Sequence, residues 1–153
     1  LLLASRLDAS ESIERRDAVD LLALAVEEGS RVEAEVDGPS LAVLGDERLL
    51  RRALRNLLEN ARRYGGGEVT VELARSSAGA EVRVCDRGPG VPEALRDRIF
   101  EPFYRLPGHA EQAGGVGLGL SLVRQIAQRH GGSVRCESRQ GGGSCFVLTV
   151  PTA

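Results

Sequence analysis

The chain contains 153 residues, close to the size of one ordinary domain, with 42% hydrophobic and 27% charged residues. This composition is typical of a globular protein. The formal net charge of −2 argues against a protein that binds nucleic acid through its phosphates. The longest apolar run, residues 21–26, is far shorter than the roughly 20 residues that span a bilayer. We therefore expect a domain that binds neither nucleic acid nor a membrane.

Three residue counts are unusual. All 20 basic residues are Arg, 16 of the 19 glycines follow position 64, and the chain contains no Met. Because a starting Met is absent, we expect the sequence to be a fragment of a longer protein.

The first 45 positions are predicted to contain two helical segments and a short strand. Residues 1–10 have the pattern of the end of a helix whose leucines packed against something outside the chain. Residues 17–28 predict a second helix that begins near Asp17 or Asp20. A short strand is expected at 31–36.

The longest predicted helix covers residues 46–63, with Asp46 as its N-cap. Apolar side chains at helical spacing predict a buried stripe formed by Leu50, Leu54, Leu57, Leu58 and Ala61. Polar side chains occupy one border of that stripe, where the helix would meet both core and cleft: Asn56, Asn60, Arg63 and Tyr64. Since Asn is a poor helix former, two on one border indicate either ligand binding or hydrogen bonds to a neighbouring sheet.

After position 67 the apolar period changes from helical spacing to two, which predicts strands. Four strands and two further helices are expected, with a loop at 105–117: strands 68–75, 80–86, 133–138 and 144–150, and helices 92–99 and 118–130. The order of these elements predicts an α/β sandwich, in which one mixed, mainly antiparallel sheet packs against a layer of helices.

The three cysteines, Cys85, Cys136 and Cys145, each lie in a strand-like run. Their spacing does not match a metal site, and an odd number is a poor disulfide framework. We therefore expect three buried, reduced thiols, as in a reducing cytosol.

Three glycine clusters, at 86–90, 115–119 and 141–143, indicate either a backbone that needs positive φ or the close approach of a ligand to the backbone. The second cluster precedes a helix, where free N–H groups and the helix dipole favour phosphate, although a flexible turn has the same pattern. It is not a Walker A loop, because that loop requires Lys. Asp86 follows a strand, where its carboxylate suits an exocyclic amine or simply caps a turn.

Together these segments resemble the sensor histidine kinases. The resemblance consists of five boxes in the family order: an N box at 51–64, a first glycine box at 86–92, an F box at 99–105, a second glycine box at 115–132 and a last glycine box at 141–151. It implies the ATP-binding catalytic domain of a two-component kinase. It also implies the Bergerat fold, which is shared by DNA gyrase B, a heat-shock chaperone and MutL-type repair ATPases.

The resemblance also implies roles for individual residues toward ATP and Mg²⁺. Asn60 would bind Mg²⁺, and Asn56 would support the metal and the phosphates; amide oxygens suit this hard cation. Asp86 would bind the adenine amino group, with Ser144 holding either Asp86 or a water beside it. The remaining nucleotide contacts would be Arg63 on the phosphates, Tyr64 on adenine or ribose, Gly88 and Gly90 beside the base, and the backbone of Gly115, Val116, Gly117, Leu118, Gly119 and Leu120 at the triphosphate. Val116 departs from the family pattern, where Thr or Ser is common.

Arg105, in a mobile lid expected at 103–116, is a candidate γ-phosphate contact or a solvated charge. Asn56, Arg63 and Arg105 would form the catalytic set. Neither His109, in the expected lid, nor His130, at a helix end, has the sequence context of a phosphoacceptor.

The resemblance divides the chain into a remnant of the second dimerisation helix with its linker, at 1–15, and the catalytic domain, at 16–153. The kinase would transfer the γ-phosphoryl group of ATP to a His of the missing dimerisation domain, for relay to an Asp of a response regulator. The parent protein would be a homodimer anchored in the inner or plasma membrane, with this domain in the cytoplasm.

Two other functions remain open for the same fold. An ATPase would place a Glu four residues before the metal-binding Asn, where this chain has Asn56, and Glu59 would face solvent. A regulatory serine kinase of the anti-sigma type would hold a protein partner instead, although the F box argues against it. A degenerate domain that binds no nucleotide is disfavoured by Asn60, Asp86 and the glycines.

Overall fold

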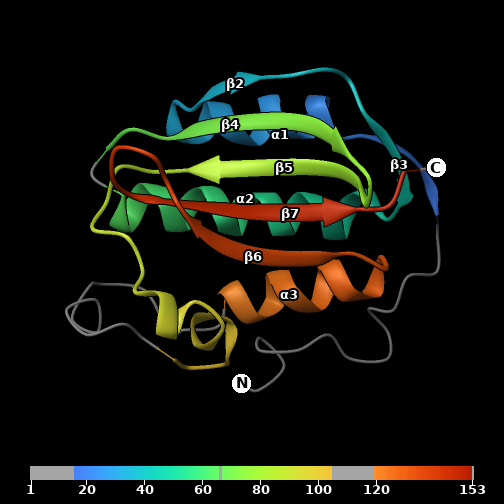
Figure 1. Ribbon diagram of the computed structural model, residues 1–153. Coiled ribbons are helices and arrows are strands. Elements are labelled where there is room, and N and C mark those ends of the chain that lie inside the picture. The colour runs from blue at the N-terminus through green and yellow to red at the C-terminus, as the bar shows by residue number, and fades with distance from the viewer. Residues whose placement is uncertain (1–15, 66, 105–118, 153) are drawn as a thin grey trace.

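The computed structural model describes residues 16–65, 67–104 and 119–152. Five strands form one sheet in the order β2-β4-β5-β7-β6 (Figure 1). Only β2 and β4 are parallel; the other neighbours are antiparallel. The strands are β2 (Glu35–Asp37), β4 (Thr70–Ser76), β5 (Gly79–Cys85), β6 (Ser133–Ser138) and β7 (Ser144–Val150). The α/β fold with a mainly antiparallel sheet is therefore confirmed.

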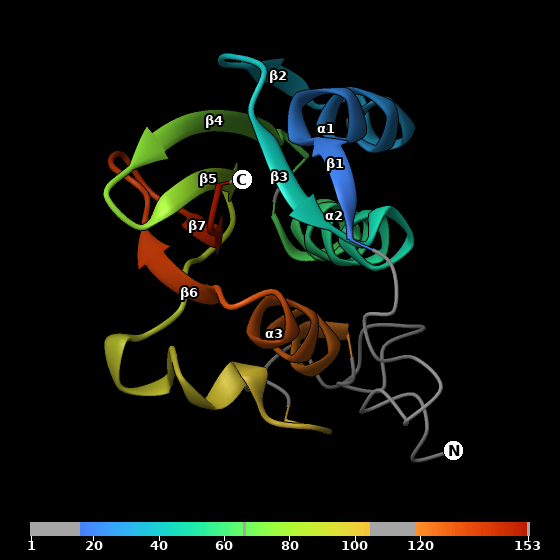
Figure 2. The ribbon, with the colours of Figure 1, turned by 90° about the vertical axis from the view of Figure 1, so that its right-hand side faces the viewer.

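Three helices cover one face of this sheet, and the edge-on view separates the two layers (Figure 2). They are α1 (Leu21–Gly29), α2 (Glu47–Tyr64) and α3 (Gly119–Arg129). A second, two-stranded sheet pairs β1 (Asp17–Asp20) with β3 (Ala42–Gly45). The core lies between the large sheet and the helices.

Helix α2 confirms the longest predicted helix. The Asp46 side chain accepts hydrogen bonds from the backbone N–H groups of Arg48, at 3.0 Å, and Leu49, at 3.2 Å. Its predicted apolar stripe is buried in full: Leu50, Leu54, Leu57, Leu58 and Ala61 are each at most 1% exposed. The border residues Asn56 and Asn60 are half-buried, as expected for positions between core and cleft.

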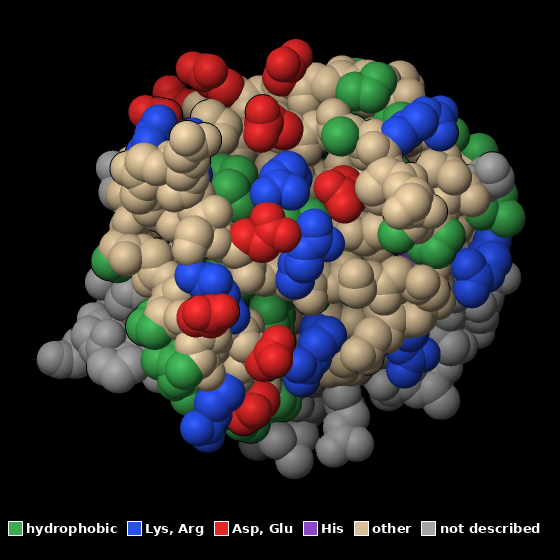
Figure 3. Space-filling view, in the orientation of Figure 1, with side chains coloured by type: hydrophobic (Ala, Val, Ile, Leu, Met, Phe, Trp, Pro, Cys, Tyr) green, Lys and Arg blue, Asp and Glu red, His purple; other side chains and the backbone are tan. Residues whose placement is uncertain are grey.

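The outer face of the sheet is covered by charge rather than by helices, and acidic and basic side chains alternate over the strands (Figure 3). Arg83 of β5 bonds to Glu137 of β6 at 2.6 Å, across the intervening β7. Arg135 contacts Glu137 at 2.6 Å and Glu81 at 3.6 Å. The aliphatic stems of these side chains cover the apolar surface beneath them, so all seven residues of β7 are buried.

Three predicted elements differ in the structure. Residues 17–20 are strand β1 rather than the first turn of a helix, because their backbone pairs with β3, and Asp20 is the N-cap of α1. Residues 30–32 form a 3-10 turn, η3 (Ser30–Val32), ahead of a three-residue β2. The helix predicted at 92–99 is two 3-10 turns, η4 (Glu93–Leu95) and η5 (Arg98–Phe100). The predicted helix at 1–10 and loop at 105–117 lie outside the described residues.

The expectation of three reduced thiols is wrong for two of them. Cys85 and Cys145 form a disulfide between β5 and β7, whereas Cys136 is a free, buried cysteine. The two bonded residues stand opposite one another in the antiparallel register, although 60 positions separate them in the chain. Spacing along the sequence does not show such a pair, because strand pairing creates it.

Candidate functional site

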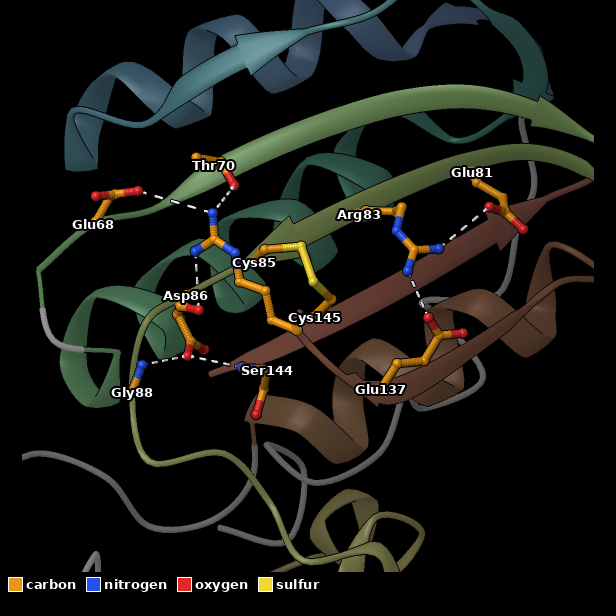
Figure 4. The surroundings of a disulfide bond; sticks show 11 residues. Glu68, Thr70, Glu81, Arg83, Cys85, Asp86, Gly88, Glu137, Ser144 and Cys145 are labelled. Carbon is orange, nitrogen blue, oxygen red and sulfur yellow. Dashed lines mark hydrogen bonds and ion pairs between the residues drawn. A yellow bond between two sulfur atoms is a disulfide. The ribbon is translucent and has the colours of Figure 1, made fainter. Parts of the chain in front are cut away.

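Asp86 directly follows β5 and is only 5% exposed. Its Oδ1 accepts hydrogen bonds from the backbone N–H groups of Gly88, at 2.9 Å, and Ser144, at 3.2 Å (Figure 4). Within the described residues, Oδ2 receives no hydrogen bond and the carboxylate forms no ion pair. One oxygen is thus fixed, and the other is open to a hydrogen-bond donor.

The end of α2 packs directly against this turn. The backbone N–H of Arg87 donates to the carbonyl oxygen of Gly65 at 2.9 Å. A Cβ on Gly65 would collide with the Asp86 side chain, and one on Gly88 would collide with the Tyr64 carbonyl oxygen. Glycine is therefore required at both positions, because the two backbones touch. Gly65 was not singled out from the sequence.

The start of β7 closes the other side of the turn. The Asp86 N–H donates to the Ser144 carbonyl oxygen at 2.9 Å, so these residues exchange bonds in both directions. Ser144 thus holds Asp86 through its backbone N–H. Gly90, at a φ of 82°, lies beside Gly143 and Ser144. The first and last glycine clusters therefore meet around one carboxylate.

Arg139 is a further residue that sequence reasoning missed. Its guanidinium donates to the Asp86 carbonyl oxygen at 3.1 Å and to Thr70 Oγ1 at 3.5 Å. It also lies 3.9 Å from Glu68. Arg139 therefore connects the loop before β7 to the end of β5 and the start of β4. No motif marks it, since the contact depends on the pairing of three strands.

Asn56 and Asn60 bring a second set of polar atoms to the same end of the domain. Asn56 Nδ2 donates to the carbonyl oxygen of Gly119, the first residue of α3, at 3.4 Å. Within the described residues, the Asn60 side chain makes no hydrogen bond. Asn56 lies where α2 meets the start of α3, and Asn60 is one turn further along α2. Leu120, in the first turn of α3, is half-buried against the core. Amide oxygens here suit a metal ion or phosphate-bound water.

Arg63 is placed differently from the asparagines. It is exposed and lines a pocket of about 500 Å³ beside α1 and η3, together with Glu28, Arg31, Val32, Arg55, Leu58, Glu59 and Arg62. Among the described residues, Arg63 forms no ion pair. The structure brings Asp86, Gly88, Gly90 and Ser144 together, and it places Arg63 among the lining residues of the pocket beside α1 and η3.

The comparisons with known proteins agree with this geometry. Residues 45–153 match the family described as "Histidine kinase-, DNA gyrase B-, and HSP90-like ATPase". The chain belongs to this family. A sensory kinase, SasA of Parasynechococcus marenigrum, is 44% identical over 128 residues, which are 80% of this chain and 33% of that protein. The histidine kinase SenX3 of Mycolicibacterium smegmatis is 37% identical over 164 aligned positions, 99% of this chain and 43% of that protein. The chain thus spans less than half of these relatives.

Solved structures match across almost their whole length. The mycobacterial sensor histidine kinase MprB superposes with a TM-score of 0.76 at 30% identity, covering 90% of this chain and 99% of that one. The ATP-binding domain of PrrB from Mycobacterium tuberculosis gives 0.72 at 32% identity, covering 92% and 99%. This ATPase-family chain is therefore the catalytic-domain type found in sensor histidine kinases, and the family implies ATP binding.

His130 of this histidine kinase-type domain is structural, as its position at a helix end suggested. It is 5% exposed; Nε2 accepts from the Asp46 N–H at 3.1 Å, and Nδ1 lies 2.8 Å from the Ile126 carbonyl oxygen. Burial lowers the pKa of His130, so the neutral ring that these two bonds require is favoured. Both nitrogens are occupied, and neither is available as a nucleophile.

Several predicted site residues of the ATPase domain lie outside the described residues. They are Arg105, Gly115, Val116, Gly117 and Leu118, together with His109. Their roles remain predictions. In the described part of the domain, no helix is long and apolar enough to cross a membrane.

Proposed function

We propose that this domain binds ATP with Mg²⁺ and donates the γ-phosphoryl group to a histidine of a dimerisation domain in its parent sensor kinase. The observation that carries the proposal is the Asp86 carboxylate, fixed at Oδ1 by two backbone N–H groups and open at Oδ2. Burial of a carboxylate without a nearby cation costs free energy unless its oxygens accept hydrogen bonds. The adenine amino group is such a donor.

The base would lie against the turn of Gly88 and Gly90. Its amino group would donate to Asp86 Oδ2, while the absence of side chains at the two glycines lets the ring approach the backbone. Tyr64, at the end of α2, would pack on the adenine or the ribose. The site would thus recognise adenine by one charge-assisted hydrogen bond and by shape.

The phosphates would lie toward Asn56 and Asn60. The backbone N–H groups that open α3, at Gly119 and Leu120, would point at them with the positive end of the helix dipole. Gly115, Val116, Gly117, Leu118, Arg63 and Arg105 would complete this half of the site. Their side chains and backbone position the phosphates; they do not react.

The residues present fit a magnesium ion. In the described part of the chain, no group of three or more His, Cys, Asp or Glu residues is arranged to hold a metal. The available ligands are therefore the amide oxygen of Asn60, supported by Asn56, together with phosphate oxygens and water. Mg²⁺ favours this set and, when bound, neutralises charge that develops on the phosphates.

The nucleophile would come from outside the described residues. His130 is buried with both ring nitrogens bonded, so the histidine that accepts phosphate is expected on the parent protein's dimerisation domain. Relay to a response-regulator Asp would follow there. We further propose a homodimeric parent anchored in the membrane, with this domain facing the cytoplasm, where ATP is available.

The hydrolase alternative is less well supported. The residue four positions before Asn60 is Asn56, and its side-chain amide donates a hydrogen bond to the Gly119 carbonyl oxygen at the start of α3. No carboxylate is therefore available at that position to activate water. Glu59 is exposed and lines the arginine-rich pocket beside α1. Steady ATP hydrolysis that Glu59→Ala abolishes would favour the ATPase.

Calorimetry and a phosphotransfer assay test the proposal together. We expect the chain to bind ATP with Mg²⁺ and, alone, to yield no acid-labile phosphohistidine from γ-labelled ATP. Addition of the parent protein's preceding segment, which we expect to carry the phosphoacceptor, should produce the label. Phosphohistidine on the isolated chain, or failure to bind ATP, would contradict the proposal.

A further inference from the structure

The disulfide lies one residue away from the proposed adenine contact on both strands. Cys85 directly precedes Asp86, and Cys145 directly follows Ser144, the residue whose N–H holds Asp86 Oδ1 (Figure 4). No part of the proposed function uses these two sulfur atoms. Their position nevertheless places a breakable covalent bond on the rung of the sheet next to the nucleotide site.

The hydrogen-bond pattern explains why the two cysteines meet. The Asp86 N–H donates to the Ser144 carbonyl oxygen, as in a hydrogen-bonded pair of the antiparallel ladder, whereas the Ser144 N–H donates to the Asp86 side chain instead. The next pair, Cys85 and Cys145, is then a non-hydrogen-bonded pair, where opposed Cα atoms come closest. Their Cα atoms lie 4.0 Å apart. The same register therefore sets both the Asp86–Ser144 contact and the disulfide.

The Cys85–Cys145 pair also lies where the pairing of β5 with β7 ends. Cys85 is the last residue of β5, and Ser144 is the first residue of β7. Strand ends fray more readily than strand centres, and the segment ahead of β7 contains the three glycines of the last box. With the disulfide intact, β5 and β7 cannot separate here. Without it, the contact between Ser144 and Asp86 depends on two hydrogen bonds, one between backbone groups and one from the Ser144 N–H to Asp86 Oδ1.

Cys85 and Cys145 are buried, but they lie outside the core between the sheet and the helices. They are 3% and 5% exposed, on the outer face of the sheet, opposite the helices. Arg139 covers that point, since it bonds to Asp86 and to Thr70, which is the cross-strand partner of Cys85. The Arg139 side chain is 15% exposed, and Arg139 lies two positions before the first of the three glycines. Movement of this one loop would admit a small thiol reagent.

The third cysteine is separated from this pair. Cys136 stands opposite Phe146 on the helix-facing side of the sheet, whereas Cys145 stands opposite Glu137 on the outer side. Burial raises the pKa of the Cys136 thiol to about 11, which keeps it protonated and unreactive. Exchange with the disulfide across the sheet is therefore disfavoured, and Cys136 is a natural control.

We propose that Cys85 and Cys145 form a reversible redox site for low-molecular-weight thiols and disulfides, and that its oxidation strengthens ATP binding by fixing Asp86. The inference rests on the proposed function, because it assumes that Asp86 contacts adenine. A disulfide in a domain that uses cytoplasmic ATP is unusual, and such disulfides are commonly redox-sensing. In this site the disulfide and the proposed ligand contact lie on neighbouring rungs of the same pair of strands.

The chemistry balances with one disulfide as oxidant. The thiolate of one cysteine attacks a sulfur of oxidised glutathione, which breaks the glutathione S–S bond and releases one reduced glutathione. The second cysteine thiolate then attacks the protein sulfur of this mixed disulfide and releases the other. Two cysteine thiols are oxidised, one glutathione disulfide is reduced, and the two thiol protons pass to the departing glutathione thiolates.

The test uses the whole chain in glutathione mixtures that range from fully reduced to fully oxidised. Thiol alkylation and peptide mass report the state of each cysteine, and calorimetry reports ATP affinity with Mg²⁺. We expect the oxidised protein to bind ATP about fivefold more tightly, at the lower end of coupling between sites. Cys85→Ser and Cys145→Ser should each bind like the reduced protein in every mixture. Cys136→Ser should respond like the wild type.

The outcomes separate the two proposals. Equal ATP affinity in both states, with the disulfide verified by mass, would overturn the redox inference and leave the proposed function intact. A disulfide that stays intact in fully reduced glutathione would show a permanent structural bond and would also overturn it. Absence of ATP binding in both states would overturn the proposed function, and the inference with it. Circular dichroism of each variant identifies any loss of fold, and the wild type alone still provides both states.

Discussion

Two carboxylates are buried to nearly the same extent in the described part of this domain, yet their oxygens accept hydrogen bonds from different groups. Glu28 is 3% exposed and Asp86 is 5% exposed. Glu28 Oε1 accepts from Arg55 at 2.7 Å, and Oε2 accepts from Arg51 at 2.9 Å and Arg55 at 3.2 Å. Asp86 has two backbone N–H donors on one oxygen, none from described residues on the other, and no cation among those residues.

The difference separates a carboxylate that holds the fold from one that can bind a ligand. Glu28 lies near the C-terminus of α1, where the helix dipole is unfavourable for an acid, so the arginines of α2 must offset both the dipole and the burial. Its hydrogen-bonding capacity is used up inside the domain. Asp86 keeps part of its hydrogen-bonding capacity for a donor that the described residues do not supply.

Removal of Glu28 should have the largest effect on stability. Glu28→Ala leaves two half-buried arginines without their partner and should lower the free energy of unfolding by about 3 kcal/mol, at the lower end for a broken buried pair, because both arginines retain contact with water. Urea unfolding measures this. ATP affinity of the folded fraction should stay within twofold of the wild type, and a tenfold loss would mean that Glu28 also serves the nucleotide site.

Asp86→Asn should show the reverse pattern. The Asn oxygen can still accept from Gly88 and Ser144, so the melting temperature should change little. The NH₂ group would replace Oδ2 and face the adenine amine, donor against donor, and ATP should bind about 2 kcal/mol more weakly, or roughly thirtyfold. Calorimetry measures this, with Glu72→Gln on the exposed side of β4 as a matched surface control. Unchanged ATP affinity would remove Asp86 from the site.

Asn60→Ala should have a smaller effect that appears only with metal present. If the Asn60 oxygen binds Mg²⁺, the affinity for ATP should become nearly independent of Mg²⁺, with little change for ATP alone. Titrations with and without Mg²⁺ test this, and Glu59→Ala, one residue away on the helix, is the control. An Asn60→Ala variant that keeps the full Mg²⁺ dependence would contradict the assignment.

The sequence could predict an element where the interactions that form it lie within one short segment, and could not where they join distant segments. Helix α2 was predictable, because its N-cap Asp46 and its leucine stripe act within one helix. Strand β1 was not, because its extended form depends on pairing with β3, more than 20 positions away. Glu28 had the pattern of a surface acid at a helix end, and only packing against α2 buries it.

The disulfide is an intermediate case. Ser144 was expected near Asp86 from the sequence, but only the antiparallel register of β5 and β7 places Cys85 opposite Cys145. Linear spacing, which was the criterion applied to the cysteines, does not contain that information. The site residues of the first and last glycine boxes were predictable as types, but their contact through Gly65 and Arg139 required the three-dimensional pairing.

The smallest expected effect is on the pH dependence of stability. The hydrogen bond from Arg55 lowers the pKa of Glu28 below 4.5; burial opposes this, and the bond from Arg51 adds to the lowering. Because the folded pKa is below the unfolded one, the stabilisation is fully present above pH 4.5 and is lost as the pH falls through the folded value. The stability gap between the wild type and Glu28→Gln should therefore be constant above that pH and shrink below it. Glu137→Gln is the matched comparison: the bond from Arg135 likewise lowers the pKa of Glu137, but its side chain is 35% exposed, so its gap should be smaller. A gap for Glu28→Gln that widens in acid would contradict the ion-pair assignment.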